Sequence, residues 1–385
     1  MPAHPLALLF DQVDDVTNEI ARREAEGTAH RATVDDEIAV YHPKQLDLVV
    51  DDVITETATA KTFRLRRADG ELVPPFQAGQ YISLRVQVGG VHTSRAFSVS
   101  SSPTVRHYYD LTIRRVPGGR ISNHLLDEVA PGDRLASGGP IGGFHHDPLF
   151  HGDELVFLAG GSGVAPFMSM IREIVDRGLP RTVHLVYGSR RTDDIIFRAE
   201  LDEIARTQPA ITVDHVISEP DADWTGPKGF LSAKVISSLT GPLRGRMTYV
   251  CGPPAMYAYQ LQQLAKMKHP RRRVRLEANG IALPPGKAPD WPDDVDPTAE
   301  VTVAVRGRGE FRTPRNRPLL DALEDNGFQP PEASCRSGEC SLCRVRVVSG
   351  SVFNAAEARI RMSDHDFGFT HSCAAFPVTD VELDY

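Results

Sequence analysis

Four of the five cysteines in this 385-residue chain fall in a spacing that few folds can accommodate. Cys335, Cys340 and Cys343 lie within the segment CRSGECSLC, and Cys373 follows after residues 344–372. Structural zinc usually takes two paired Cys-x2–4-Cys knuckles, and Cys373 has no second cysteine beside it. Five cysteines in a chain without a recognisable secretory signal favour a metal site over disulfides. We therefore expect the four cysteines to hold one metal centre.

The spacing Cys-x4-Cys-x2-Cys followed by a distant cysteine is that of the plant-type [2Fe–2S] cluster. Two irons need four thiolates, and Ser337 and Gly338 allow a tight loop whose N–H groups can point at the sulfides. Residues 299–385 resemble a plant-type ferredoxin, with CRSGECSLC and the later HSCAAF as the matching segments. The resemblance implies a β-grasp fold. The predicted metal ligands are Cys335, Cys340, Cys343 and Cys373.

The hydrophobic pattern predicts two further domains before the cysteine-rich one. From residue 46, segments such as YISLRVQV alternate apolar and polar residues, and Gly89-Gly90 marks a hairpin. This pattern predicts an antiparallel β-barrel over 46–150. Strands then alternate with helices over 151–278, which predicts a parallel sheet covered on both faces. The expected fold class is multidomain α/β plus β, with a Rossmann-like second domain.

The remaining segments and the composition set outer limits on function. Apolar residues at helical spacing predict an N-terminal helical extension over 1–45, either packed on the body or serving as a docking element. The proline-rich stretch 279–298 is typical of a semi-rigid linker. A net charge of −8 argues against a nucleic-acid binder, and no apolar run is long enough to span a membrane. We expect a cytoplasmic protein.

Two segments of the barrel region carry flavin-type motifs. In GGRISNHL a glycine turn opens a helix, and the free N–H groups of such a turn favour a phosphate. Together with RAFSVSS (residues 95–101), it resembles the R-x-Y-S and G-x-x-S segments that hold flavin in the ferredoxin–NADP reductase superfamily. The resemblance implies that the flavin is bound by Arg95, Ala96, Phe97, Ser98, Thr112, Ile113, Arg114, Gly119, Arg120, Ile121 and Ser122.

The same resemblance assigns individual roles. Arg95 and Ser122 would bind phosphate, and Phe97 would stack on the ring where the family usually has Tyr. Ser98 would lie near the reactive flavin nitrogen as a catalytic residue. In GPIGGFHHD, Phe144 fits the place of a ring against adenine, which favours FAD over FMN. We interpret the histidines beside it, at 145, 146 and 151, as a polar surface loop and not as a metal site.

Three loops that follow strands predict the nucleotide site. AGGSGVAP, YGSRR and CGPPAM each leave the carboxyl end of a strand, and in a parallel sheet these loops share one edge. The first resembles the G-x-G-x-x-P of the same superfamily, in which the cysteine of CGP lies beside the nicotinamide and is here taken as catalytic. Ser189 and Arg190 resemble the Ser-Arg pair that holds the ribose 2′-phosphate in NADPH-using relatives, but Phe197 stands where those relatives usually have Tyr. NADH and NADPH both remain open. The predicted nucleotide-binding residues are Gly161, Ser162, Gly163, Pro166, Ser189, Arg190, Cys251, Gly252 and Pro253.

The order flavin, nucleotide, ferredoxin resembles the reductase components of bacterial multicomponent oxygenases, such as phthalate dioxygenase reductase. The resemblance implies an NAD(P)H-dependent oxidoreductase that passes hydride to FAD and single electrons through a [2Fe–2S] cluster to a partner oxygenase. One alternative is the same chemistry serving a non-oxygenase acceptor, such as a hybrid-cluster protein, a corrinoid protein or a separate ferredoxin. Another is a zinc-stapled binding module fused to a degenerate reductase.

Overall fold

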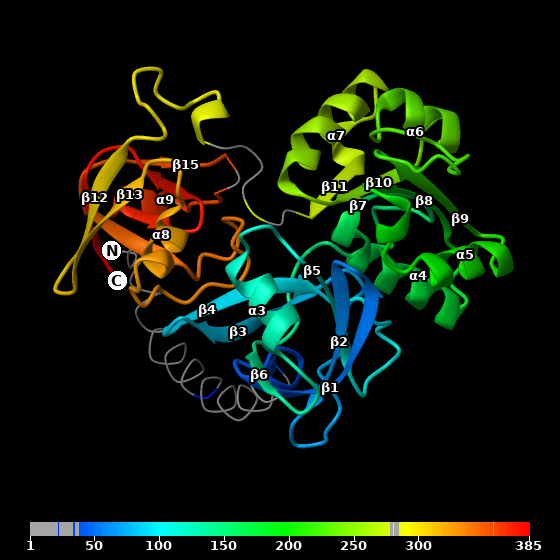
Figure 1. Cartoon of the computed structure of the whole chain (residues 1–385), viewed down its shortest axis with the longest axis horizontal. Helices are drawn as coiled ribbons and strands as arrows, with labels where there is room; N and C mark the ends of the chain where they lie inside the picture. Colours follow the sequence, from blue (N-terminus) through cyan, green and yellow to red (C-terminus); the bar gives the residue numbers. More distant parts are fainter. Residues whose placement is uncertain (1–21, 23–33, 35–37, 278–279, 281–284, 357) are drawn as a thin grey trace, which may run out of the picture.

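The computed structural model describes residues 22, 34, 38–277, 280, 285–356 and 358–385. Figure 1 shows three bodies, with the barrel in blue and cyan below the green nucleotide domain and the yellow-to-red C-terminal domain. The predicted extension over 1–45 lies almost wholly outside the described residues. Within the part of the chain that the structure describes, no helix is long and apolar enough to cross a membrane.

The first domain is a curled antiparallel sheet with the strand order β4-β3-β6-β1-β2-β5. A bridge between Val99 and Leu111 joins the end of β4 to β5, which brings the two outer strands together. Gly89 and Gly90 both have positive φ and form the turn of the β3–β4 hairpin, as predicted. The elements are β1 (Leu46–Thr57), β2 (Ala60–Arg67), β3 (Tyr81–Val88), β4 (Val91–Ser98), β5 (Tyr109–Arg114), α3 (Arg120–Glu128) and β6 (Arg134–Ser137).

The second domain is a five-stranded parallel sheet with the order β11-β10-β7-β8-β9. One hydrophobic cluster lies on each face, because alternate side chains of strands such as β7 point to opposite sides. The chain order reverses at β7, between β8 and β10, and this is where open α/β sheets bind ligands. The strands are β7 (Glu154–Gly160), β8 (Thr182–Ser189), β9 (Ile211–Ile217), β10 (Met247–Cys251) and β11 (Val274–Glu277). The helical segments are η1 (Gly161–Val164), α4 (Ala165–Arg177), η2 (Thr192–Asp194), α5 (Arg198–Thr207), α6 (Ala233–Thr240), α7 (Pro254–Lys266) and η3 (Arg271–Arg273).

These two domains share a core. Ala60, Ala78 and Phe144 from the barrel side belong to the same hydrophobic cluster as α4 and β7. Ser169 on α4 donates a hydrogen bond to the carbonyl of Ser101. The barrel and the nucleotide domain are therefore held together by apolar packing and by buried hydrogen bonds.

The third domain has a mixed sheet with the order β13-β12-β18-β14-β16, in which β12 and β18 are parallel. Helix α8 packs on this sheet through Leu319 and Leu323. The arrangement is the expected β-grasp. Its elements are β12 (Glu300–Val305), β13 (Gly309–Pro314), α8 (Leu319–Asp325), β14 (Arg344–Ser349), β15 (Val352–Asn354), α9 (Met362–Asp366), β16 (Phe369–His371), β17 (Ala375–Pro377) and β18 (Val381–Asp384).

Residues 285–298 of the predicted linker pack on this third domain. They begin with the short helix η4 (Pro285–Lys287). Trp291 is buried in a cluster with Leu320 and Phe353, and its indole N–H donates to the carbonyl of Val295. Residues 285–298 thus extend the ferredoxin-like domain.

Candidate functional site

The four predicted ligand cysteines converge in the third domain. The thiols of Cys340 and Cys373 both interact with that of Cys335, and Cys373 also interacts with Cys343. The backbone N–H groups of Ser337 and Cys340 each point at Cys335 Sγ, at 3.4 Å. Four sulfurs and inward-pointing amides are what a [2Fe–2S] cluster requires, so the residues fit this group.

Neighbouring backbone explains why the loop is built around Gly338. Gly338 has a φ of 80°, and a Cβ there would come within 2.7 Å of the Cα of Ala358. Its carbonyl accepts a hydrogen bond from the N–H of Arg359 and lies 2.9 Å from His371 Nδ1. The Ser372 hydroxyl donates to the carbonyl of Cys343. These contacts join the loop to the segment that carries the fourth cysteine.

The thiols also differ in acidity. Hydrogen bonds from Cys340 and Cys373 lower the pKa of Cys335, and a hydrogen bond from Cys373 lowers that of Cys343 to about 7. The pKa values of the two donors, Cys340 and Cys373, are raised for the same reason. Metal binding requires thiolates, and Cys335 and Cys343 are the two thiols whose pKa values are lowered. Among the described residues, no three His, Cys, Asp or Glu side chains are placed to ligate one common ion.

The predicted flavin-ring segment lies at the end of β4, next to the cysteine loop. Residues 95–98 are half-buried, and Ser98 pairs in register with Tyr81 of β3. Burial raises the pKa of Tyr81, and negative charge at Cys335 and Cys340 raises it further. The interaction places the sulfur ligands close to the strand pair that carries Ser98.

The predicted phosphate end lies at the start of α3. A Cβ at Gly119 would come within 2.6 Å of Ser122 Oγ, so only glycine allows the turn to close on the serine. Within the described residues α3 has no side-chain cap, and its first-turn N–H groups suit an anion. Arg120 donates hydrogen bonds to the carbonyls of Val88 and Glu324, and Ile121 packs into the barrel core.

Arg95 has acidic neighbours from the third domain. Its guanidinium lies 3.6 Å from Asp321 and 3.5 Å from Glu324, both on α8. Burial is the largest influence on Arg95 and lowers its pKa, and the nearby Arg336 acts in the same direction. The predicted phosphate-binding arginine thus lies at the contact between the barrel and the ferredoxin-like domain.

The predicted flavin residues on β5 are buried or already paired with other protein groups. Thr112 is buried, and its hydroxyl contacts those of Thr62 and Ser100, while Ile113 belongs to the barrel core. Arg114 forms an ion pair with Asp194 of the nucleotide domain. Arg114 therefore connects the two domains.

Phe144 does not offer a ring face to an adenine. It is 3% exposed, and its ring packs edge-on against Tyr249 and tilted against Phe167. The structure therefore corrects the expected stacking role, because the whole side chain is used in the core shared by two domains.

The three nucleotide loops meet at one edge of the parallel sheet. Gly163 lies against the end of β10, where an added Cβ would come within 2.4 Å of the Cys251 carbonyl oxygen. Cys251 is 1% exposed at the last position of β10. Gly161 and Ser162 form η1, Pro166 lies in the first turn of α4, and Gly252 and Pro253 precede α7. The edge suits a pyrophosphate and a nicotinamide.

The residues predicted to contact the ribose end differ in exposure. Ser189 is buried at the end of β8. The exposed Arg190 pairs with Glu219 at 2.9 Å, and the Glu219 N–H also donates to the Arg190 carbonyl. A carboxylate therefore lies beside Arg190, the arginine at the position of a ribose 2′-phosphate.

Sequence reasoning missed Glu277. It is paired in register with Cys251 and is 9% exposed, and burial together with the charge of Glu339 raises its pKa to about 8. Glu339 belongs to the cysteine loop, so this carboxyl lies where the nucleotide edge meets the third domain. An acid ending the apolar strand VRLE was the available signal.

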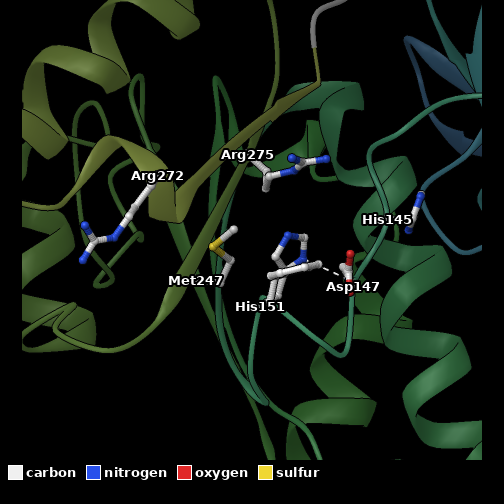
Figure 2. A pocket seen from close by; sticks show the side chains of 7 residues that line it. His145, Asp147, His151, Met247, Arg272 and Arg275 are labelled. Carbon is white, nitrogen blue, oxygen red and sulfur yellow. Dashed lines mark hydrogen bonds between the residues drawn. The ribbon is translucent and has the colours of Figure 1, made fainter. Parts of the chain in front are cut away.

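A separate cavity of about 250 Å³ lies near Met247, at the opposite end of β10 from Cys251. Figure 2 shows His151 beside Asp147, with Arg275 and Arg272 around the same space. His151 is buried against Tyr249, and burial together with the charge of Arg275 lowers its pKa to about 4. The interpretation of a polar surface loop is wrong for this histidine, because it is buried and packs against Tyr249.

Three protein-family models match the chain. They are an oxidoreductase FAD-binding domain at residues 45–146, an oxidoreductase NAD-binding domain at 157–262 and a 2Fe-2S iron-sulfur cluster binding domain at 303–378. Among curated proteins, the glycine betaine monooxygenase reductase subunit of Pseudomonas aeruginosa is 30% identical over 86% of this chain and 93% of its own length. The chain belongs to this family of FAD- and [2Fe–2S]-containing reductases.

Other members of this reductase family and solved structures agree. The ferredoxin reductase component of 3-ketosteroid-9-alpha-monooxygenase from Mycolicibacterium smegmatis is 31% identical over 88% of this chain and 97% of its own length. Phthalate dioxygenase reductase shares the fold, with a TM-score of 0.61 and 24% identity over 89% of this chain and 98% of that one. The reductase is an oxidoreductase with FAD, NAD and cluster domains.

Proposed function

We propose that this reductase delivers electrons from NAD(P)H to a partner oxygenase component. The relatives named above are reductase subunits of monooxygenases and match over nearly their whole length. The observation that carries the proposal is the position of the cysteine loop against β4, where Ser94 donates to the carbonyl of Ala333 and Arg336 Nε donates to the carbonyl of Ser94 at 2.7 Å. The cytoplasm, which supplies NAD(P)H and keeps cysteine thiols reduced, is the proposed location.

When bound, the nicotinamide and flavin supply a two-electron hydride transfer and the cluster supplies one-electron steps. The chain's own residues position these groups. We propose that the turn from Gly119 to Ser122 and the N-terminus of α3 bind phosphate, and that Ser98 orients its hydroxyl toward the flavin ring. Cys251 would form the wall beside the nicotinamide, since it ends β10 at the shared loop edge.

The purified protein tests the proposal in two steps. Its absorption spectrum, with iron and acid-labile sulfide content, should show one flavin and one [2Fe–2S] cluster per chain. A colourless, zinc-containing protein would contradict the electron-transfer proposal. Addition of NADH or NADPH should then support turnover of a candidate oxygenase component, whereas efficient reduction of a separate ferredoxin without oxygenase turnover would favour another acceptor.

A further inference from the structure

A buried polar network fastens the cysteine loop to the barrel. Arg336 directly follows Cys335, and its Nε donates to the carbonyl of Ser94 at 2.7 Å. Its Nη2 donates to the Thr93 hydroxyl at 2.6 Å, and its Nη1 donates to Asp321 at 3.0 Å. Ser94 also donates to the carbonyl of Ala333. One side chain next to a cluster ligand therefore bonds both to β4 and to α8.

Glu324 is the acidic centre of this network. It is 4% exposed, and its carboxylate accepts from Arg336 and from the Thr93 hydroxyl. A buried carboxylate needs a partner of opposite charge, because desolvation is otherwise too costly. Arg336 supplies that charge at hydrogen-bond distance, whereas Arg95 stays 3.5 Å away. Arg95 also donates to the carbonyl of Ser94 at 2.9 Å and to the Thr93 hydroxyl at 3.3 Å.

The backbone of Arg336 shows that its position is specified. Its φ is 51°, in the left-handed region that residues with a Cβ rarely adopt. Such a conformation persists where surrounding contacts determine it. The side chain is 10% exposed, so its five donors are directed into the contact between the domains and not into solvent.

We propose that Arg336 is a positioning residue that, through Glu324 and Thr93, fixes the cluster loop against β4 and so keeps the cluster beside the flavin. The proposal rests on the proposed function and adds the contact that sets the flavin-to-cluster approach. Arg336 would thus influence electron transfer from flavin to cluster, although it does not lie at the nucleotide-binding edge of the sheet.

The test compares Thr93→Val and Arg336→Gln with two controls in the holoenzyme. Thr93→Val removes the hydroxyl on the barrel side and leaves the cysteine loop unchanged. Thr55→Val makes the same change at an exposed position of β1. Arg312→Gln removes an exposed ion pair with Glu300 between β13 and β12 of the same domain. The electron paramagnetic resonance signal of the reduced cluster and the flavin content show whether each variant is loaded.

Stopped-flow reduction by NADH or NADPH should separate the two electron steps. In Thr93→Val, we expect flavin reduction at the wild-type rate and cluster reduction slowed by at least about fivefold. The loss of a hydrogen bond to a charged group lowers the equilibrium constant for contact between the cysteine loop and β4 by about that factor or more. Arg336→Gln should slow cluster reduction further, and Arg336→Lys should restore part of the rate. Both controls should match the wild type.

A second readout is independent of turnover. Hydrogen–deuterium exchange of residues 91–98 and 333–341 should rise in Thr93→Val with an unchanged cluster signal. Wild-type cluster reduction and wild-type exchange in a fully loaded Thr93→Val protein would overturn the proposal. If the wild-type protein itself passed no electrons from NAD(P)H to its cluster, the proposed function would fail instead, and the exchange data would still test the docking contact.

Discussion

Cys251 and Glu277 lie side by side in register on the parallel strands β10 and β11, at the edge of the sheet where the nucleotide loops meet. One is a buried thiol at the predicted nicotinamide position, and the other is a buried carboxyl close to Glu339 of the cysteine loop. The pair therefore lies between the predicted nicotinamide position and the cysteine loop. A proton on Glu277 avoids placing two negative charges together at this junction.

Glu277 should make stability depend on pH. Burial, followed by the charge of Glu339, raises its folded-state pKa from 4.5 to about 8, so the folded protein binds the proton more tightly than the unfolded chain. This contribution is fully present below the unfolded pKa of 4.5 and is lost as pH rises through about 8. In Glu277→Gln, the fall in unfolding free energy between pH 5 and pH 8.5 should shrink by up to about 4 kcal/mol. Denaturant titrations at both pH values measure it, and an unchanged pH dependence would show that Glu277 is ionised in the folded state.

The Arg190–Glu219 ion pair should favour NADH over NADPH. A carboxylate at the ribose end can accept hydrogen bonds from a 2′-hydroxyl and repels a 2′-phosphate. We expect Glu219→Gln to raise kcat/KM for NADPH by about tenfold, which corresponds to about 1.4 kcal/mol, with little change for NADH. Steady-state kinetics with both nucleotides measure the ratio. Glu203→Gln, which removes the exposed pair with Arg206, is the matched control. A parallel change for both nucleotides would rule out a role in specificity.

Gly163→Ala should impair nucleotide binding. The new Cβ would come within 2.4 Å of the Cys251 carbonyl oxygen and 2.6 Å of the Gly252 N atom, and neither backbone atom can move aside easily. We expect KM for the nucleotide to rise at least about tenfold, with a stability loss of about 1–3 kcal/mol from overpacking. Gly138→Ala is the control, since no atom lies within 4 Å of a Cβ there among the described residues. An unchanged KM would show that the η1 turn does not need this close approach.

Cys343→Ser should separate the two halves of the electron path. NAD(P)H should still bleach the flavin, because the barrel and the nucleotide domain share a core that the substitution does not touch. Cytochrome c reduction should fall by at least about a hundredfold, since thiolate ligation is required to hold the cluster. Ser341→Ala in the same loop serves as the control. Undiminished cytochrome c reduction would mean that electrons leave directly from the flavin.

Much of this architecture follows from the sequence. The change from period-two alternation to strand–helix alternation separates the barrel from the parallel sheet, and Cys335, Cys340, Cys343 and Cys373 predict a cluster domain by spacing alone. The local pattern is sufficient for these two predictions. Secondary structure depends on residues that are neighbours in the chain, and the cluster needs a fixed number of cysteine ligands.

The contacts between domains could not be predicted in this way. Arg95 reads as a phosphate ligand, yet its acidic neighbours Asp321 and Glu324 come from a helix more than two hundred residues later. Phe144 occupies a motif position but is drawn into a core that exists only once two domains pack. Glu277 becomes unusual only through burial beside Glu339. Tertiary packing determines the surroundings of all three residues, and the pattern of a single sequence carries no signal for such packing.

The packing of Trp291 has an optical consequence. Its indole lies in the same hydrophobic cluster as Cys343 and Cys373, and the chain has only one other tryptophan, Trp224, which packs against the core of the nucleotide domain. An iron–sulfur centre absorbs broadly across the range in which indole emits, so light from Trp291 should dim as the cluster is assembled and return as it is lost. With Trp224 replaced by Phe, the protein would carry its own fluorescent gauge of cluster content, readable without any electron acceptor.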